Sequence, residues 1–299
     1  MSTSLPNSFI KQYESDVHHV FQREGGYLRH TVRFKTGVVG ASTTFQKAGK
    51  GTATTKARHG VVTPMNQDHT AILCTLEDFY APDWVDKLDE AKTNIDERQV
   101  IAKGGAWAIG RKVDDQILAA LDTTSEATVT ITVTNRATIR STLAEFVEAA
   151  WDNDVPNDGQ VFGVLSPRAW SQASLLDEFS NSQWVGMDGL PWKTGMPTGG
   201  KFREWNGVKW MMHTGVPGKG TATSAQFIWH KMAIGYATGA HANNNAENDA
   251  IRADIWWSGE RQSHLVTHCM SGGACLIDAT GVIQATNNDT TAISTATAP

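Results

Sequence analysis

The residues from Asp96 to Leu121 predict one long amphipathic helix, which limits the folds open to this chain more than any other feature. Apolar side chains recur at intervals of three, four and eight residues, which is the period of a helix and not of a strand. At 1.5 Å per residue the helix would be about 39 Å long, which is more than a compact domain usually needs. We expect its core-facing stripe to contain Ile101, Ile109, Val113, Ile117 and Leu121.

Three glycines lie inside this helix, at Gly104, Gly105 and Gly110. Each of them destabilises a helix interior by about 1 kcal/mol relative to alanine. No phosphate-loop spacing surrounds them, so a role in packing is favoured over a role in binding a ligand. Their presence therefore indicates a close approach of another backbone segment or a bend in the helix.

A basic, glycine-studded segment precedes the helix, between residues 31 and 63. Its many β-branched and few large apolar residues are typical of a long exposed β-ribbon. No acidic residue occurs between Gly25 and Gln67. A two-stranded ribbon cannot bury enough surface to be stable alone, so it needs another surface to lie on. Its basic residues are Arg29, Arg33, Lys35, Lys47, Lys50, Lys56 and Arg58.

The other elements mix helices and strands without a regular β-α-β alternation, which favours the α+β class. Residues 128–133 and 161–165 predict strands, and residues 136–151 predict a helix between them. We expect an aromatic corner at residues 79–84 and a flexible tail at the polar residues 286–299. Further strands are predicted at residues 68–76, 207–212, 250–257, 264–269 and 274–277, and a short helix at residues 4–21.

Two near-copies of one hexapeptide, Gly49–Thr54 and Gly218–Thr223, resemble half of a phosphate-binding loop. The full motif has a glycine five residues before the one that precedes the lysine, and a serine or threonine directly after the lysine. Thr44 and His213 occupy the first of these positions, and a glycine follows each lysine. The two copies therefore predict flexible basic loops, with nucleotide binding as the weaker alternative.

The sequence offers no convincing metal or catalytic site. His264 and His268, with Cys269 and Cys275, could suggest zinc, but ordinary sheet residues explain them better. No Gly-x-Ser-x-Gly elbow or His-Glu-x-x-His pair is present. We therefore expect no catalytic residue, no cofactor and no metal.

Charge and apolar content indicate the protein's surroundings. With Cys74, the chain has three scattered cysteines, which imply no disulfide framework and favour a reducing, intracellular environment. No apolar stretch is long enough for a signal peptide or a membrane-spanning helix, so we expect a soluble protein without membrane contacts. The formal net charge of −5 argues against extensive coating by nucleic acid.

Two stretches carry a resemblance to a known family. They are the aromatic and acidic residues 78–87 (DFYAPDWVDK) and the helical residues 108–117 (AIGRKVDDQI), which follow a short N-terminal helix and a basic ribbon. In this order they resemble the major capsid proteins of tailed bacteriophages, which share the Hong Kong 97-like fold. The strand and helix at residues 161–170 and the strand at residues 271–278 also look like family features.

The resemblance implies an N-terminal arm at residues 1–33, an extended loop at 34–70 and a peripheral domain at 71–135, with residues 96–121 as its spine helix. It further implies an axial α/β domain at residues 136–250 and strands at 251–285 that return to the peripheral domain. The function implied is a non-enzymatic shell protein that assembles as hexamers and pentamers into an icosahedral head around double-stranded DNA, which it contacts non-specifically. Scaffolding and portal proteins would be its partners, and a decoration protein would be a further possible partner. The protein would be part of the virion, assembled in the cytoplasm of the bacterial host.

Two alternatives remain open at this point: the shell of an encapsulin-like bacterial nanocompartment, which would have the same fold, and a cytosolic nucleotide-dependent enzyme that uses the Gly-Lys-Gly loops. For the shell we predict that the basic ribbon lies over an acidic surface of a neighbouring copy. The expected acidic residues are Glu77, Asp78, Asp83, Asp86, Asp89 and Glu90.

Overall fold

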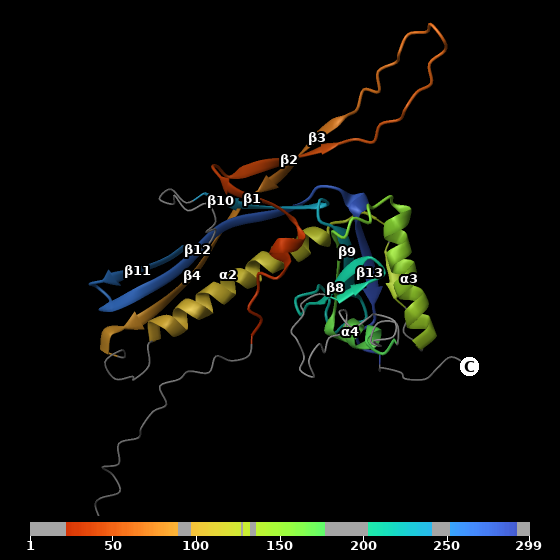
Figure 1. The fold of residues 1–299 in the computed structure, drawn as a ribbon. Helices are drawn as coiled ribbons and strands as arrows, with labels where there is room; N and C mark the ends of the chain where they lie inside the picture. The colour runs from red at the N-terminus through yellow and green to blue at the C-terminus, as the bar shows by residue number, and fades with distance from the viewer. Residues whose placement is uncertain are drawn as a thin grey trace, which may run out of the picture. The chain divides into compact units, whose positions relative to one another are not determined.

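The computed structural model describes residues 22–88, 97–126, 128–131, 136–176, 203–240 and 252–291 (Figure 1). The chain divides into two compact units. The first contains residues 1–25, 78–111 and 251–270, and the second contains residues 26–77, 112–250 and 271–299. The long helix α2 (Glu97–Leu121) and the long strand β12 (Ser263–Leu276) each run from one unit into the other.

The first unit contains β4 (Glu77–Asp86), the first part of α2, β11 (Arg252–Ser258) and the first part of β12. β11 and β12 are antiparallel, with Trp257 opposite His264, and β4 also pairs with β12. The aromatic corner predicted at residues 79–84 is wrong, because these residues lie within the strand β4. Pro82 can occupy this strand because proline, which is unfavourable in central strands, is tolerated in edge strands.

In the second unit, the chain enters through a short 3₁₀ helix, η2 (Leu28–Thr31), and continues as β1 (Arg33–Val38). β1 pairs in parallel with β10 (Ile234–Gly239), which is antiparallel to the later part of β12. The ribbon itself consists of β2 (Ser42–Ala48) and β3 (His69–Thr75), joined by residues 49–68. The predicted ribbon began too early, because β1 belongs to the sheet with β10.

Strand β12 is one continuous element of 14 residues, where the sequence predicted separate strands at 264–269 and 274–277. Gly272 and Gly273, which separate the two predicted strands, both lie in register opposite β10. A Cβ added at Gly273 would lie 3.0 Å from the carbonyl carbon of Thr75 and 3.3 Å from Cα of Leu76. Glycine is therefore required here because the end of β3 passes directly over β12.

The rest of the second unit is a six-stranded sheet with two helices, α3 (Arg136–Asp152) and α4 (Pro167–Ala173). The sheet is mixed: β13 is parallel to β5 and β6 is parallel to β8, whereas its other neighbouring strands are antiparallel. The strand order is β5 (Val129–Ile131), β13 (Val282–Asn287), β9 (Ser224–His230), β6 (Val161–Leu165), β8 (Val208–Met212) and β7 (Arg203–Trp205).

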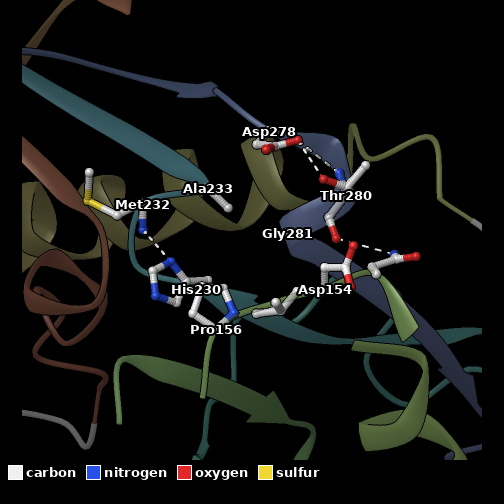
Figure 2. Close-up of a pocket in the computed structure, with 10 residues that line it drawn as sticks. Asp154, Pro156, His230, Met232, Ala233, Asp278, Thr280 and Gly281 are labelled. Carbon is white, nitrogen blue, oxygen red and sulfur yellow. Dashed lines mark hydrogen bonds between the residues drawn. The ribbon is translucent and has the colours of Figure 1, made fainter. Parts of the chain in front are cut away.

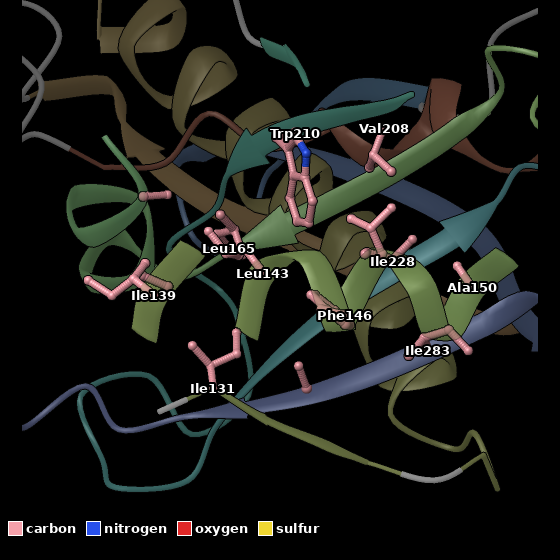
Figure 3. Close-up of a cluster of buried hydrophobic side chains, with 14 of the residues drawn as sticks. Ile131, Ile139, Leu143, Phe146, Ala150, Leu165, Val208, Trp210, Ile228 and Ile283 are labelled. Atoms are coloured by element: carbon pink, nitrogen blue, oxygen red, sulfur yellow. The ribbon is translucent and has the colours of Figure 1, made fainter. Parts of the chain in front are cut away.

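The core of this unit lies between the sheet and α3 (Figure 3). All seven residues of β9 are buried, as expected for a strand covered on both faces. At the centre, the ring centroids of Phe146 and Trp210 lie 6.0 Å apart, and both side chains are fully buried. The five α3 residues whose helical spacing predicts an inward face all belong to this core: Ile139, Leu143, Phe146, Val147 and Ala150.

The C-terminal segment is ordered further than the sequence predicted. Asn287 ends β13 and is fully buried, so the expected flexible tail at residues 286–299 began too early. The Ser166 hydroxyl caps α4 and donates to an Asp289 carboxylate oxygen 2.8 Å away, and the Arg168 guanidinium donates to the Thr291 carbonyl. Residues 292–299 lie outside the described part of the chain, as does the short helix predicted at residues 4–21.

Candidate inter-subunit surface

Four of the five residues predicted to form the stripe of α2 are buried. Ile109, Val113, Ile117 and Leu121 are at most 5% exposed, whereas Ile101, nearer the N-terminal end, is partly exposed. The helix runs from Glu97 to the predicted end at Leu121, and the predicted start at Asp96 lies outside the described residues. Among the described residues, no helix is long and apolar enough to cross a membrane.

A buried carboxylate on α2 holds the chain that leads into the ribbon. Asp114 is fully buried and accepts from the backbone N–H of Leu28 at 3.0 Å and of Tyr27 at 3.4 Å. Its other contact is Nε2 of the buried His213, 3.3 Å from Oδ2. The amide of Gly215 in turn donates to Nδ1 of His213, which fixes the imidazole. Sequence reasoning missed this cluster, because an aspartate within a helical repeat normally indicates the solvent face.

Two of the three α2 glycines are explained by close packing. Gly25 has a left-handed backbone (φ +83°) and lies against the backbone of Gly110, whose added Cβ would come within 2.9 Å of the Glu24 carbonyl oxygen. At Gly105, an added Cβ would meet the His268 imidazole, with Cε1 2.8 Å away. A Cβ added at Gly104 would have no neighbouring atom within 4 Å, so close packing does not explain this glycine.

The basic residues at the base of the ribbon are engaged within the chain. The Arg29 guanidinium carbon lies 4.3 Å from the centroid of the Phe34 ring. Arg33 lies 5.5 Å from the centroid of the Phe45 ring, and the Lys35 ammonium donates to the Thr43 hydroxyl at 2.6 Å. These side chains therefore contribute to the local packing of β1 and β2, leaving less of their charge available to a partner.

Two lysines of the ribbon form ion pairs with the body of the second unit. Lys47 lies 2.8 Å from Asp278, and Lys50 lies 2.5 Å from Asp154. Burial alone would raise the pKa of Asp278, but hydrogen bonds from Lys47 and Thr280 hold it below its usual range. The Asp154 pKa is lowered by its hydrogen bond and charge interaction with Lys50, whose own pKa is raised for the same reasons.

The remaining two basic residues, Lys56 and Arg58, lie in the exposed segment between β2 and β3. Neither makes a hydrogen bond or an ion pair with another described residue. Beyond them the exposed side chains become apolar, with Val61 and Val62 at 93% and 66% exposure and Met65 at 53%. The outer part of the ribbon thus presents free positive charge next to apolar side chains.

The predicted acidic residues lie along one strand. Glu77, Asp78, Asp83 and Asp86 all belong to β4 and are exposed, while Asp89 and Glu90 lie outside the described residues. Exposed aromatic side chains accompany them, with Tyr80 67% and Trp84 38% exposed, and the Arg261 guanidinium lies 4.7 Å from the Trp84 ring centroid. The aromatic and acidic residues were found from the composition of this segment, but their place on a strand was not anticipated.

A surface hollow is lined by Asp278 and Asp154, the residues that form ion pairs with Lys47 and Lys50 (Figure 2). Its polar groups are already used within the chain. Asp278 accepts from the Thr280 hydroxyl at 2.8 Å, and Nε2 of His230 lies 3.3 Å from Asp158. The hollow is lined by Asn153, Asp154, Val155, Pro156, His230, Met232, Ala233, Asp278, Thr280 and Gly281. Its geometry is that of a junction between turns and not of a catalytic centre.

The weaker chemical readings gain no support from the described residues. No group of three or more His, Cys, Asp or Glu side chains there is placed to hold a metal ion. His264 instead packs against Trp257, with ring centroids 4.8 Å apart. The two hexapeptides, at residues 49–54 and 218–223, lie in turns or irregular segments and open no helix, unlike a phosphate-binding loop.

Comparisons with known proteins agree on one family. A family model described as "Phage capsid protein" matches residues 5–289. No curated protein sequence matches the chain.

Solved structures with similar folds come from several phages. The capsid of cyanophage P-SCSP1u has a TM-score of 0.70 at 12% identity, covering 96% of this chain and 95% of its own. Mycobacterium phage Che8 gives 0.68 at 14% identity, covering 97% and 100%. The capsid of Ralstonia phage GP4 gives 0.69 at 10% identity, covering 96% and 97%. These similarities support the prediction of a phage capsid protein. They provide no support for the nanocompartment or the enzyme alternative.

The family match spans nearly the whole chain, and the α+β architecture with its long helix, two-stranded ribbon and six-stranded sheet is that of these capsids. The chain therefore belongs to the phage capsid protein family, and it is a structural shell protein, a major capsid protein of the tailed-phage type with the Hong Kong 97-like fold.

Proposed function

We propose that copies of this capsid protein join by laying the outer ribbon of one copy on the acidic β4 surface of a neighbouring copy. The observation that carries the proposal is the unequal use of the basic residues. Five of them are engaged within their own chain, whereas Lys56 and Arg58 are exposed and make no ion pair with a described residue. The β4 surface offers the opposite charge.

The apolar side chains support the same arrangement. Val61, Val62 and Met65 at the outer ribbon are exposed, as are Tyr80 and Trp84 among the β4 acids. Desolvated aromatic anchors with charged groups around them are typical of the stable part of a protein interface. Apolar contact would then supply affinity, and the charges would set the register and the rate of encounter.

Within this shell we assign residues 1–33 to an arm, 34–70 to the extended loop, and α2 with β4, β11 and β12 to the peripheral domain. The axial domain would be the six-stranded sheet, including β5 and β13, which residues 136–250 alone would omit.

We further propose that the protein assembles as hexamers and pentamers around double-stranded DNA in the host cytoplasm. Scaffolding and portal proteins would be its partners, and a decoration protein would be an additional one. Negative-stain microscopy of the expressed protein tests the shell directly, since closed particles are expected and their diameter constrains the copy number.

The contact itself is tested by reversing Lys56 and Arg58 to glutamate. Lys50 is left unchanged, because reversal there would also place two carboxylates together at Asp154. We expect a folded subunit, by circular dichroism, that forms no shells in sedimentation and microscopy. The control reverses two other exposed lysines, Lys103 and Lys219, and should still assemble.

A second variant distinguishes a specific contact from a general effect of charge. Asp78 and Asp86 lie on the same face of β4 as Tyr80 and Trp84. Adding Asp78→Lys and Asp86→Lys to the ribbon double variant restores opposite charges across the proposed interface and should recover part of the assembly. Normal shells from the ribbon variant alone would refute the contact. Loss of assembly in the Lys103 and Lys219 control would instead assign the effect to net charge.

A further inference from the structure

Two of the three cysteines lie together where the ribbon crosses the sheet. Cys74 is the second-to-last residue of β3, and Cys275 is the second-to-last residue of β12. The thiol of Cys74 donates to the carbonyl of Gly273 at 3.4 Å, and it is also in hydrogen-bond contact with the Cys275 thiol. Gly273 and Cys275 are two residues apart on one strand, so they share a face.

The crossing holds the two strands unusually close. Because Gly273 has no side chain, the backbone at Thr75 and Leu76 comes into contact with β12 beside the two thiols. Packed sheets normally lie about 10 Å apart, which is too far for a disulfide between them. Because Gly273 has no side chain, β3 and β12 approach more closely at this crossing than packed sheets normally do.

The surroundings of the cysteines favour a disulfide between Cys74 and Cys275 over one that involves Cys269. Cys74 is fully buried in an apolar cluster with Phe45, Leu76 and Ile277, and Cys275 packs against this cluster but is partly exposed. A small oxidant can therefore reach the pair at Cys275. Cys269 lies six residues before Cys275 on the same strand, about 20 Å away at the rise of a strand, and cannot take part.

We propose that Cys74 and Cys275 are an oxidation site that closes into an intramolecular disulfide and fastens the ribbon strand β3 to β12. This inference concerns a single copy of the chain and does not depend on the contact between copies proposed above. The structure describes all three cysteines as free thiols.

The chemistry needs a two-electron oxidant, of which a peroxide is the simplest class. The Cys275 sulfur attacks one peroxide oxygen, the O–O bond breaks, and a sulfenic acid and one water form. The Cys74 sulfur then attacks the Cys275 sulfur, the S–O bond breaks, and a second water leaves as the disulfide forms. Each thiol loses one hydrogen, and the peroxide takes up both electrons.

The hydrogen bond between the thiols determines which of them loses its proton first. As donor to Cys74, the Cys275 thiol lowers the pKa of Cys74, while its own pKa is raised. The first proton therefore leaves from Cys74, and the proton that remains is shared between the two sulfurs. Attack on a peroxide by the partly exposed sulfur of Cys275 then requires that this proton moves onto the Cys74 sulfur, which leaves Cys275 as the thiolate.

The test uses the full chain, first reduced and then treated with hydrogen peroxide. The expected intact mass falls by about 2 Da, and peptide mapping finds Cys74 linked to Cys275. A Cys269→Ser variant should behave like the wild type. Cys74→Ala and Cys275→Ala should not lose this mass, and either one suffices if the other fails to fold. Wild-type protein that only gains oxygen atoms, links through Cys269 or does not react would overturn the proposal.

A second measurement tests the fastening. Closing so long a loop should raise the melting temperature by about 5–10 °C, and reductant should reverse the rise. Amide hydrogen exchange in β2 and β3 should slow on oxidation in the wild type and in Cys269→Ser, but not in Cys275→Ala. If the disulfide forms while exchange in both strands stays unchanged, the link does not fasten the ribbon and that part of the proposal is wrong.

Discussion

The six-stranded sheet and the ribbon are built from the same chain on opposite principles. In the sheet, every residue of β9 is buried, and α3 closes one face with apolar side chains. In the ribbon, β2 alternates exposed and partly covered residues around the single buried Phe45, and the segment beyond it is exposed except at Gly49 and Gly60, which are partly covered. The sheet is complete within one copy, whereas the ribbon leaves its side chains uncovered.

The difference shows where a shell protein places its stability and where it places its capacity to assemble. Burial of large apolar side chains, at roughly 25 cal/mol per Å² of apolar surface, stabilises the sheet before any partner arrives. A two-stranded ribbon buries too little to be stable alone, so neighbouring surfaces must hold it. Changes in the sheet should therefore affect folding, and changes in the ribbon should affect what the folded subunit can do.

The largest effect is expected in the sheet core, at Phe146→Asp. A charge at this fully buried position has no partner, and its unfavourable free energy, on the order of 5 kcal/mol or more, is comparable to the stability of a whole domain. We expect no folded, soluble subunit by circular dichroism and size-exclusion chromatography. The control is Ala144→Asp, two residues earlier on the exposed side of α3, which should fold normally. A folded Phe146→Asp subunit would show that the core tolerates charge.

Prediction from the sequence succeeded where one periodic pattern controls burial. The helical repeats of α2 and α3 identify residues such as Ile117 and Phe146, which are buried in the structure. The same reasoning failed where two distant segments meet. The sequence predicted separate strands on either side of Gly273, because the segment that requires a glycine there lies about 200 positions away in the chain. The buried contacts of Asp114 were missed, because its partner amides at Tyr27 and Leu28 lie 87 and 86 positions away.

For the proposed contact surfaces on the ribbon and β4, the sequence likewise predicted the local pattern but not the contacts between distant segments. Charge composition alone located the basic ribbon and the acidic β4 segment. It could not separate Lys50, which is paired with Asp154, from Lys56, which has no ion pair with a described residue, because the pairing depends on a turn about 100 residues later. Which charges remain available to a partner is a property of the folded chain.

An intermediate effect is expected within α2, where one helix contains both packed and open glycines. Gly110→Ala places a methyl group against the backbone of Glu24 and should destabilise by about 1–3 kcal/mol despite the better helix propensity of alanine. Gly104→Ala meets no neighbouring atom and should stabilise by up to about 1 kcal/mol.

Urea unfolding of the unassembled subunits measures both changes as shifts of the midpoint at a constant slope. Equal shifts in the same direction would contradict the assignment, since only Gly110 lies against a second backbone segment. The two substitutions change the same residue type within two turns of one helix, so the difference between them isolates the packing contribution.

The smallest effect is expected for the ion pairs that join the ribbon to its own unit. The folded-state pKa of Asp278 is lowered, so this carboxylate contributes stability above its unfolded pKa of about 3.9, and the contribution is lost as the pH falls through the folded value. The pair with Lys47 is partly open to water and screened by salt, so Asp278→Asn should destabilise by about 1 kcal/mol or less at pH 7.

Comparison of wild-type and Asp278→Asn protein across pH provides the check. Their difference in unfolding free energy should be constant from pH 7 to about 5, shrink as the pH falls below about 4, and vanish once Asp278 is protonated. Asp154→Asn should give a still smaller difference, because Asp154 and Lys50 are both highly exposed. A difference for Asp278→Asn that persists at pH 2 would mean that the carboxylate acts through packing and not through its charge. The ribbon would then be attached to its own subunit by contacts that acid does not release, and its freedom to reach a neighbour would not depend on these ion pairs.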